Sequence, residues 1–553
     1  MNPAAASPEQ RQGDLAAFVD RIVAEIEPLH LRHNEAVWKA NVTGDPAHEQ
    51  ESARLDAEIR TIFSRREPFQ FLSGLLAAGG VPDPKLQRQA VLLHHTFRAH
   101  QIPPETIERM VKIEKGLESR FNNFRAELDG ARVTDNQLLE VLRLENDSAR
   151  RRRAWEASKQ IGREVRADLL ELVGIRNRAA RDLGFPNYYS MMLELDELDE
   201  RELFAVLDDL ERGTRPLFEA YKRELDARLG RRFGVAAAEI RPWHYSDPFF
   251  QEAPAAEVDL DACFPGQSLE QLTRRFYHAI GFQIDDLLAR ADLYERPGKC
   301  QHAFCLSVDH RQDIRVLCNL RPTERWMSTM LHEFGHAVYD QSIDPGLPFL
   351  LRSPAHTLAT EASAMLFGRL SKNAAWLTTY AGMEAGEARR AGEAVARAIC
   401  GQLLVQTRWC LVMCHMERAL YRDPAQDLDR VWWDLVERFQ SLTRPEGRSG
   451  PDWASKIHFS VAPVYYHNYL LGEMMASQLQ RHIQREVLRN GGDVWQRYVT
   501  SPEVGGFLRS RLYRTGRLMD WRETLRQATG EALSPAALVD ELAARSPREG
   551  RIE

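Results

Sequence analysis

One short segment, His332-Glu333-Phe334-Gly335-His336, restricts the possible fold more than any other part of the sequence. Residues four apart in an α-helix lie one turn above each other, so both imidazoles face the same side and can bind one ion. Apolar residues surround the pair and indicate a buried helix: Met330, Leu331, Phe334, Ala337 and Val338. The alternative, a surface helix with two solvated histidines, conflicts with these flanks. Buried histidines at this spacing need a partner, and the sequence therefore predicts a zinc-binding helix.

A catalytic zinc needs a third protein ligand and an open position for water. Two downstream side chains, His356 and Glu361, are candidates. Glu361 opens an apolar helical segment, where a carboxylate either complements the helix dipole or meets the metal. We favour the metal, because two histidines and a glutamate form a known ligand set, and His356 would then lie beside the site or face the substrate. The expected cofactor is Zn²⁺, one ion per chain, held by His332, His336 and Glu361.

Glu333 lies beside the first histidine, about 100° around the helix, where it can reach a zinc-bound water without being a ligand. Such a site polarises a peptide carbonyl and lowers the pKa of the bound water towards about 7. Glu333 would take the proton of that water and then deliver it to the leaving amine. The pattern predicts a zinc hydrolase of the HExxH-plus-Glu type, a metallopeptidase.

Most of the remaining sequence predicts helices, because apolar residues recur at three- and four-residue spacing, as between Leu203 and Leu210. Residues 301–320 differ: two short β-branched and apolar runs flank a polar tip at His310–Asp313, which predicts a small β-hairpin and is the only convincing sheet signal. A chain of 553 residues is too long for one core, yet no linker separates autonomous domains. We expect one catalytic domain, residues 1–553, of two helical subdomains interwoven around one cleft.

Composition excludes several other classes of protein. The net charge of −7 argues against a general nucleic-acid binder, and the run Arg150–Arg153 is best explained as a solvated helix face. No apolar run reaches the roughly 18–20 residues of a membrane helix, so no membrane partner is expected. The amino terminus has neither a basic nor an apolar signal region, and none of the seven cysteines forms a CxxC pair. A cytoplasmic protein with reduced thiols is the expectation.

The ligand spacing and several longer segments resemble known zinc peptidases. HEFGH followed by Glu361, 25 residues after its second histidine, is similar to the angiotensin-converting-enzyme family and to the related thimet-oligopeptidase family. The literal HEFGH is commoner in the second family, whereas Arg153–Tyr189 and Trp453–Gln480 resemble the first, in its bacterial type. The likeness extends from about residue 30 to 540. It implies a mainly α fold with two helical lobes around a deep central cleft and the hairpin next to the zinc site.

The resemblance also implies roles for residues outside the zinc helix. Lys456 and Tyr466 would bind the free carboxyl terminus of a peptide, and His458 would bind a substrate carbonyl. Tyr469 would stabilise the oxyanion, which makes Tyr469, His458 and the general-base glutamate the catalytic residues. His302–Ala303 matches a hairpin pair that lines the primed side, where a strand can pair with an extended peptide. Without the resemblance, the lysine and both tyrosines would pass as packing residues with polar tips.

The sequence departs from the animal members of the first family at several places. Thr360 and Met365 replace a histidine and an aspartate near the third ligand, so the group that orients a zinc histidine is supplied differently or is missing. Asn468 replaces an arginine that binds an activating chloride, and the resemblance therefore carries no expectation of chloride activation. Cys300 and Cys318 fall where those proteins have a disulfide, but we expect them to be reduced.

Three functions are consistent with these residues. The first is a zinc peptidyl-dipeptidase that releases C-terminal dipeptides from short peptides, because Lys456 offers a site for a free carboxyl terminus. The second is a thimet-like endo-oligopeptidase, which accepts longer peptides and ignores the terminus. The third is a zinc-bearing binding protein that has lost catalysis, against which the intact Glu333 speaks. For either enzyme the expected partners are short peptide substrates.

Overall fold

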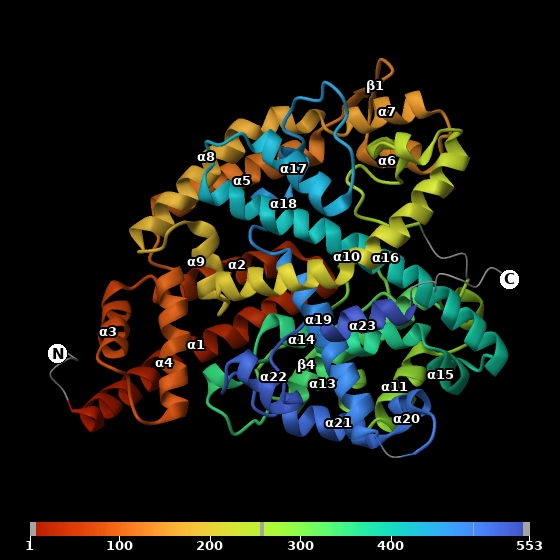
Figure 1. Ribbon diagram of the computed structural model, residues 1–553. Helices are drawn as coiled ribbons and strands as arrows, with labels where there is room; N and C mark the ends of the chain where they lie inside the picture. Colours follow the sequence, from red (N-terminus) through yellow and green to blue (C-terminus); the bar gives the residue numbers. More distant parts are fainter. Residues whose placement is uncertain (1–6, 255–258, 490, 546–553) are drawn as a thin grey trace. The chain divides into compact units, whose positions relative to one another are not determined.

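The computed structural model describes residues 7–254, 259–489 and 491–545, and most of them are helical (Figure 1). The mainly α fold predicted from the sequence is confirmed. The chain divides into two compact units, and each unit combines three separate segments of the sequence. Unit 1 comprises Met1–Gln101, Val258–Ala394 and Leu471–Ala537, and unit 2 comprises Ile102–Glu257, Val395–Leu470 and Leu538–Glu553. No described helix is both long and apolar enough to cross a membrane.

Unit 1 contains the following helices and strands: α1 (Pro8–Thr43), α2 (Pro46–Phe63), α3 (Arg66–Ala77), α4 (Pro84–Ala99), α11 (Leu269–Ala279), α12 (Asp285–Arg290), β3 (Phe304–Ser307), β4 (Ile314–Leu317), α13 (Glu324–Ser342), α14 (Thr357–Gly368), α15 (Ala374–Trp376), α20 (Val494–Thr500), α21 (Pro502–Leu508) and α22 (Trp521–Thr529). Unit 2 contains α5 (Pro104–Asn123), β1 (Ala126–Leu128), β2 (Ala131–Val133), α6 (Asp135–Leu144), α7 (Ser148–Ala157), α8 (Gln160–Asp182), α9 (Tyr188–Leu195), α10 (Glu200–Phe233), α17 (Leu428–Gln440) and α18 (His458–Val461). Three helices contain a boundary between units: α16 (Ala385–Arg422), α19 (His467–His482) and α23 (Ala536–Arg545).

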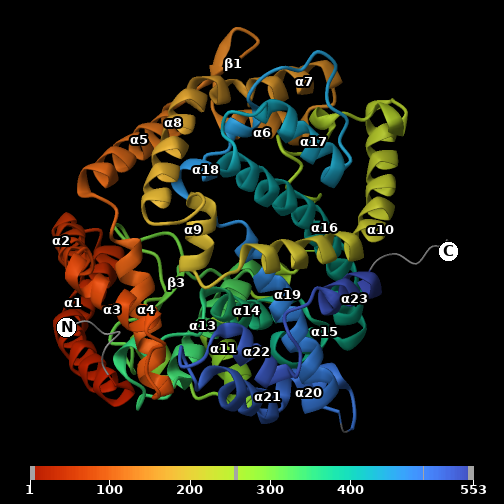
Figure 2. The ribbon, with the colours of Figure 1, turned by 60° about the vertical axis from the view of Figure 1, so that its left-hand side comes forward.

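The first helices of unit 1 begin at local sequence signals. Ser7, Asp45 and Asp83 cap α1, α2 and α4, and each is followed by a proline at the first helical position. The cap side chain accepts a backbone N–H that has no partner inside the helix, and proline has no N–H to lose there. Helices α1 to α4, at the red end of the colour scale, lie together in Figures 1 and 2. Their apolar faces share one core that includes Leu15, Phe18, Ile22, Phe63 and Phe97.

Helix α13 carries the HExxH segment, and its apolar flanks are fully buried, as the sequence predicts. Helix α14 runs beside it in both views (Figures 1 and 2). Gly335 allows this close packing: a Cβ at its position would lie 2.7 Å from the Cα of Ala364, which no real side chain tolerates. The two helices therefore lie close together at Gly335, which lies between the two histidines of the motif.

The hairpin predicted within residues 301–320 is confirmed as the antiparallel pair β3 and β4, with Phe304 opposite Leu317 and Ser307 opposite Ile314. A second hairpin, β1 and β2 in unit 2, was not predicted. Its turn contains Asp129 and Gly130, both with positive φ, and Asp-Gly is a recognised hairpin signal. The strands are only three residues long, too short to show an alternating pattern.

Candidate active site

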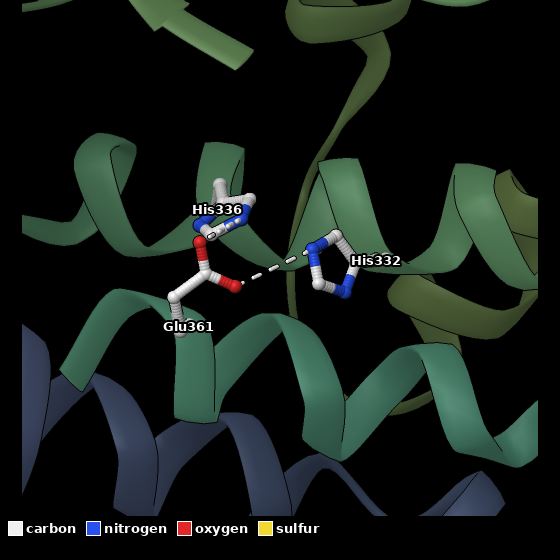
Figure 3. Close-up of side chains that lie close together, drawn as sticks. All are labelled: His332, His336 and Glu361. Atoms are coloured by element: carbon white, nitrogen blue, oxygen red, sulfur yellow. Dashed lines mark ion pairs between the residues drawn. The ribbon is translucent and has the colours of Figure 1, made fainter. Parts of the chain in front are cut away.

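The three predicted metal ligands lie together in unit 1. His332 and His336 project from α13 towards Glu361 on α14 (Figure 3). Nε2 of His332 is 3.7 Å from one carboxylate oxygen of Glu361, and Nε2 of His336 is 4.0 Å from the other. Their ligand atoms all lie within 4.8 Å of one another. Across the described ranges, no other group of three His, Cys, Asp or Glu side chains is arranged to hold a metal ion.

The donor set and its spacing fit zinc. Zinc binds imidazole nitrogen and carboxylate oxygen at about 2.0–2.2 Å, so ligand atoms of a tetrahedral site are about 3.3 Å apart. The measured separations are slightly wider, within reach of small side-chain rotations. Burial lowers the pKa of His332 to about 4, and burial together with the neighbouring His332 lowers the pKa of His336 to about 3. Both rings are therefore neutral at pH 7, which is the form that binds a metal.

Thr360 supplies a contact that the sequence left open. Its Oγ1 lies 2.7 Å from Nδ1 of His336. In the tautomer that leaves Nε2 of His336 available for a metal, Nδ1–H donates to this hydroxyl. Such contacts fix the ring orientation and tautomer of a metal-binding histidine.

His356, the other ligand candidate, has a structural position instead. It caps α14: its Nδ1 accepts the backbone N–H of Leu358 at 3.0 Å, and the side chain is buried. The ring also lies near Trp521. His356 therefore fixes the start of the helix that carries Glu361, and it is not among the residues that line the cavity around the ligands.

A cavity of about 790 Å³ opens beside the ligands, and Glu333 lies on its wall. Glu333 is only 8% exposed; burial, together with the nearby charge of Glu361, raises its pKa to about 8. A bound cation would oppose this shift, because positive charge favours the carboxylate. Glu333 therefore lies buried on the wall of the same cavity that the three predicted metal ligands line.

The hairpin lies next to the predicted metal ligands, as expected, because β3 lines the same cavity. Ala303 also lines it, whereas His302 is exposed and is not among the lining residues. Sequence reasoning missed Asp340 on the cavity wall, although it follows His336 by four residues and so shares its helix face. Burial raises the pKa of Asp340 to about 7.

Unit 2 brings the other predicted residues into a second cluster. Lys456 donates from Nζ to Oε1 of Gln251 at 3.1 Å, and the ammonium lies 4.7 Å from the ring centre of Phe249 and 4.9 Å from that of Trp409. Burial lowers the pKa of Lys456 to about 8, and Asp247 partly offsets this. Such an ammonium is held in place by one amide and two aromatic faces.

Three aromatic residues with predicted roles, His458, Tyr466 and Tyr469, pack on one another in unit 2. The ring centres of His458 and Tyr466 are 5.1 Å apart, and those of Tyr466 and Tyr469 are 5.7 Å apart. Tyr466 is buried, whereas Tyr469 is 37% exposed. Trp409 lies against Tyr466 as well as Lys456 and joins the two parts of the cluster. We refer to Gln251, Trp409, Lys456, His458, Tyr466 and Tyr469 as the Lys456 cluster.

Comparison with known proteins assigns the chain to a family. Residues 141–544 match the model described as Peptidase family M3, and residues 9–239 match the model described as angiotensin-converting enzyme. The first match covers more than half of the sequence. The chain belongs to peptidase family M3, a family of zinc metallopeptidases. The resemblance to both peptidase families inferred from the sequence is confirmed.

Two relatives carry the name of the angiotensin-converting enzyme. The chain is 21% identical over 475 residues to the angiotensin-converting enzyme-like protein Ace3 of Mus musculus, an alignment that covers 78% of this chain and 62% of that protein. It is 22% identical over 462 residues to the angiotensin-converting enzyme of Rattus norvegicus, with 73% and 33% covered. The chain thus spans less than two thirds of either relative.

Proposed function

We propose that this protein is a zinc-dependent peptidase that hydrolyses short peptides and releases C-terminal dipeptides. The observation that carries the proposal is the convergence of His332, His336 and Glu361 beside the buried carboxylate of Glu333, on the wall of one cavity. A ligand set with an adjacent base is the arrangement that water-based hydrolysis requires. We further propose that the two units form one catalytic domain with one Zn²⁺.

The residues of unit 1 would divide the work as follows. The two histidines and Glu361 hold Zn²⁺, which when bound acts as a Lewis acid that polarises a peptide carbonyl and lowers the pKa of water. Glu333 accepts a proton from the attacking water and passes it to the amine nitrogen of the scissile bond. Thr360 keeps the ring of His336 in one orientation.

The Lys456 cluster of unit 2 would bind the substrate. Nζ of Lys456 donates to the carboxylate at the C terminus of a peptide, which is a charge-assisted hydrogen bond. The Tyr466 hydroxyl donates to the same carboxylate, and His458 donates to a substrate carbonyl. The Tyr469 hydroxyl donates to the carbonyl oxygen of the scissile bond as that oxygen gains negative charge. A binding site for a free terminus makes the enzyme an exopeptidase.

A second candidate is an endo-oligopeptidase of the thimet type. The family match favours it, since the model described as Peptidase family M3 covers more of the chain than the converting-enzyme model does. In that case the Lys456 cluster would not require a free terminus, and cuts would occur at internal bonds.

A matched pair of peptides separates the candidates. The purified protein, loaded with zinc, is incubated with one peptide as the free acid and as the C-terminal amide, and the products are identified by mass spectrometry. Release of a dipeptide from the free acid alone supports the exopeptidase. Equal cleavage of both forms at internal bonds supports the endo-oligopeptidase. Retained zinc without cleavage of either form would mean a binding protein, and loss of cleavage with a chelator, restored by zinc, confirms the metal requirement.

A further inference from the structure

The segment between His458 and Tyr469 contains a turn with an unfavourable backbone conformation. Val464 has a φ of 59°, in the left-handed region. Side chains branched at Cβ are rarely found there, because the branch crowds the following carbonyl. A conformation of this kind persists only where the surrounding structure holds it.

A buried carboxylate holds this turn from one side. Glu417 on α16 is 2% exposed, and its Oε1 accepts the backbone N–H of Val464 at 2.9 Å. Burial raises the pKa of Glu417 to about 8, although this hydrogen bond and the charge of Arg176 both lower it. Burial of a carboxylate is unfavourable unless hydrogen bonds or opposite charge compensate, and the proposed mechanism gives Glu417 no chemical step.

A buried guanidinium holds the preceding helix. Arg176 on α8 is 2% exposed and donates to the carbonyl oxygens of Phe459, at 2.9 Å, and Ser460, at 2.6 Å. These two carbonyls belong to α18, the four-residue helix that begins with His458. Arg176 also donates to the Tyr421 hydroxyl on α16 at 2.9 Å. Both sides of the turn are therefore fixed by buried polar side chains, the carboxyl group of Glu417 and the guanidinium of Arg176.

We propose that Glu417 and Arg176 are positioning residues that hold the strained turn, and through it the side chains of His458 and Tyr466. The inference rests on the proposed function, because that function gives the two aromatic residues their roles. Tyr466 follows Val464 by two residues, and its ring packs on His458. If Val464 relaxed to a negative φ, the path of the chain into α19 would change, and Tyr466 would leave its place beside His458.

The test compares two substitutions of Glu417. Glu417→Gln keeps an oxygen that can accept the Val464 N–H in a side chain of nearly the same shape, whereas Glu417→Leu removes it. We expect kcat to fall about 100-fold in Glu417→Leu, the scale of loss that small misplacements of catalytic groups cause, and to stay within a few-fold of the natural protein in Glu417→Gln. Zinc content should be unchanged in both, because the metal ligands lie in unit 1.

A second background separates positioning from general damage. Glycine adopts a positive φ without strain, so Val464→Gly removes the need to hold the turn. Glu417→Leu should therefore cost clearly less kcat in the V464G background than in the natural one, a coupling that a double-mutant cycle measures. Equal losses in both backgrounds, or equal losses in Glu417→Gln and Glu417→Leu, would overturn the proposal.

A measurement on the natural protein needs no stable variant. Hydrogen exchange at the Val464 amide should be slow, because a buried carboxylate accepts it. Exchange as fast as that of exposed loop amides would overturn the inference even if Glu417→Leu did not fold. The two proposals remain distinguishable: absence of peptide cleavage by the natural protein contradicts the function, whereas normal cleavage with uncoupled variants contradicts only the positioning.

Discussion

The hydroxyl of Thr360 lies 2.7 Å from Nδ1 of His336, and Thr360 immediately precedes Glu361. One turn of α14 therefore provides both a proposed zinc ligand and the group that orients another ligand on α13. The animal enzymes that the sequence resembles have a histidine at this place, so the sequence left open whether the histidine is oriented at all. In the structure, the small and uncharged side chain of Thr360 takes this role, because its hydroxyl can accept from Nδ1–H.

Removal of the Thr360 hydroxyl should weaken zinc binding. Thr360→Val keeps the shape of the side chain but cannot accept from Nδ1–H, so the ring of His336 loses its fixed tautomer and orientation. Losses of such contacts typically reduce metal affinity about 10–100-fold, and we expect a decrease of this size. Competition with a chromophoric chelator measures it. Thr360→Ser retains the hydroxyl and should bind zinc nearly as well as the natural protein; equal affinity in Thr360→Val would contradict the assigned role.

Gly335 should be intolerant of even a methyl group. A Cβ there would meet the Cα of Ala364 and push α14, with Glu361, away from α13. Overpacking of this kind costs about 1–3 kcal/mol, so Gly335→Ala should lower the free energy of unfolding by that amount and also weaken zinc binding. Gly116 on α5 is the matched control, because no atom lies within 4 Å of the place that its Cβ would take. Gly116→Ala should be neutral or stabilising by up to about 1 kcal/mol in urea unfolding.

The sequence predicted those parts of the site that depend on local geometry. His332, Glu333 and His336 follow from the period of one helix, and their burial follows from the apolar flanks. Glu361 required tertiary packing between two helices, and its assignment drew on knowledge of zinc ligand sets. Gln251 lies 205 residues from Lys456, in a segment with no periodic pattern, so no local signal points to it.

The strained turn at Val464 could not be predicted from the sequence either. A valine at position 464 would be expected to have a negative φ, in extended or helical backbone. Glycine or asparagine is the usual signal for a positive φ. The conformation of Val464 depends on Glu417, which lies on α16, 47 residues away in the sequence, and belongs to no recognisable motif. Asp129-Gly130 is the opposite case: the signal for a hairpin was present in the sequence, but the flanking strands were too short to support it.

Substitution of Glu333 should separate catalysis from metal binding. Glu333→Gln preserves the size of the side chain but cannot accept a proton from water. General acid–base catalysis contributes typically about 10²–10⁴-fold, so kcat should fall by a factor in this range while zinc stays bound. Peptide hydrolysis at constant zinc content, with the metal quantified by mass spectrometry, checks both quantities. Undiminished hydrolysis in this variant would exclude Glu333 as the base and leave the proposed mechanism without a proton carrier.

The alkaline limb of the pH profile should report Lys456. Burial lowers the pKa of this ammonium to about 8, so it is charged at pH 7 and increasingly neutral above pH 8. A neutral amine cannot form a charge-assisted hydrogen bond with a carboxylate, and kcat/KM reflects the ionisation of the free enzyme. For a peptide with a free C terminus, kcat/KM should therefore fall towards tenfold per pH unit above pH 8. Lys456→Arg controls for every other group that titrates in this range, because its guanidinium stays charged throughout. In Lys456→Arg, kcat/KM for the free acid should therefore lack the decline above pH 8 that Lys456 causes in the natural protein. If the natural protein and Lys456→Arg showed the same decline, Lys456 would not be the residue that binds the C terminus.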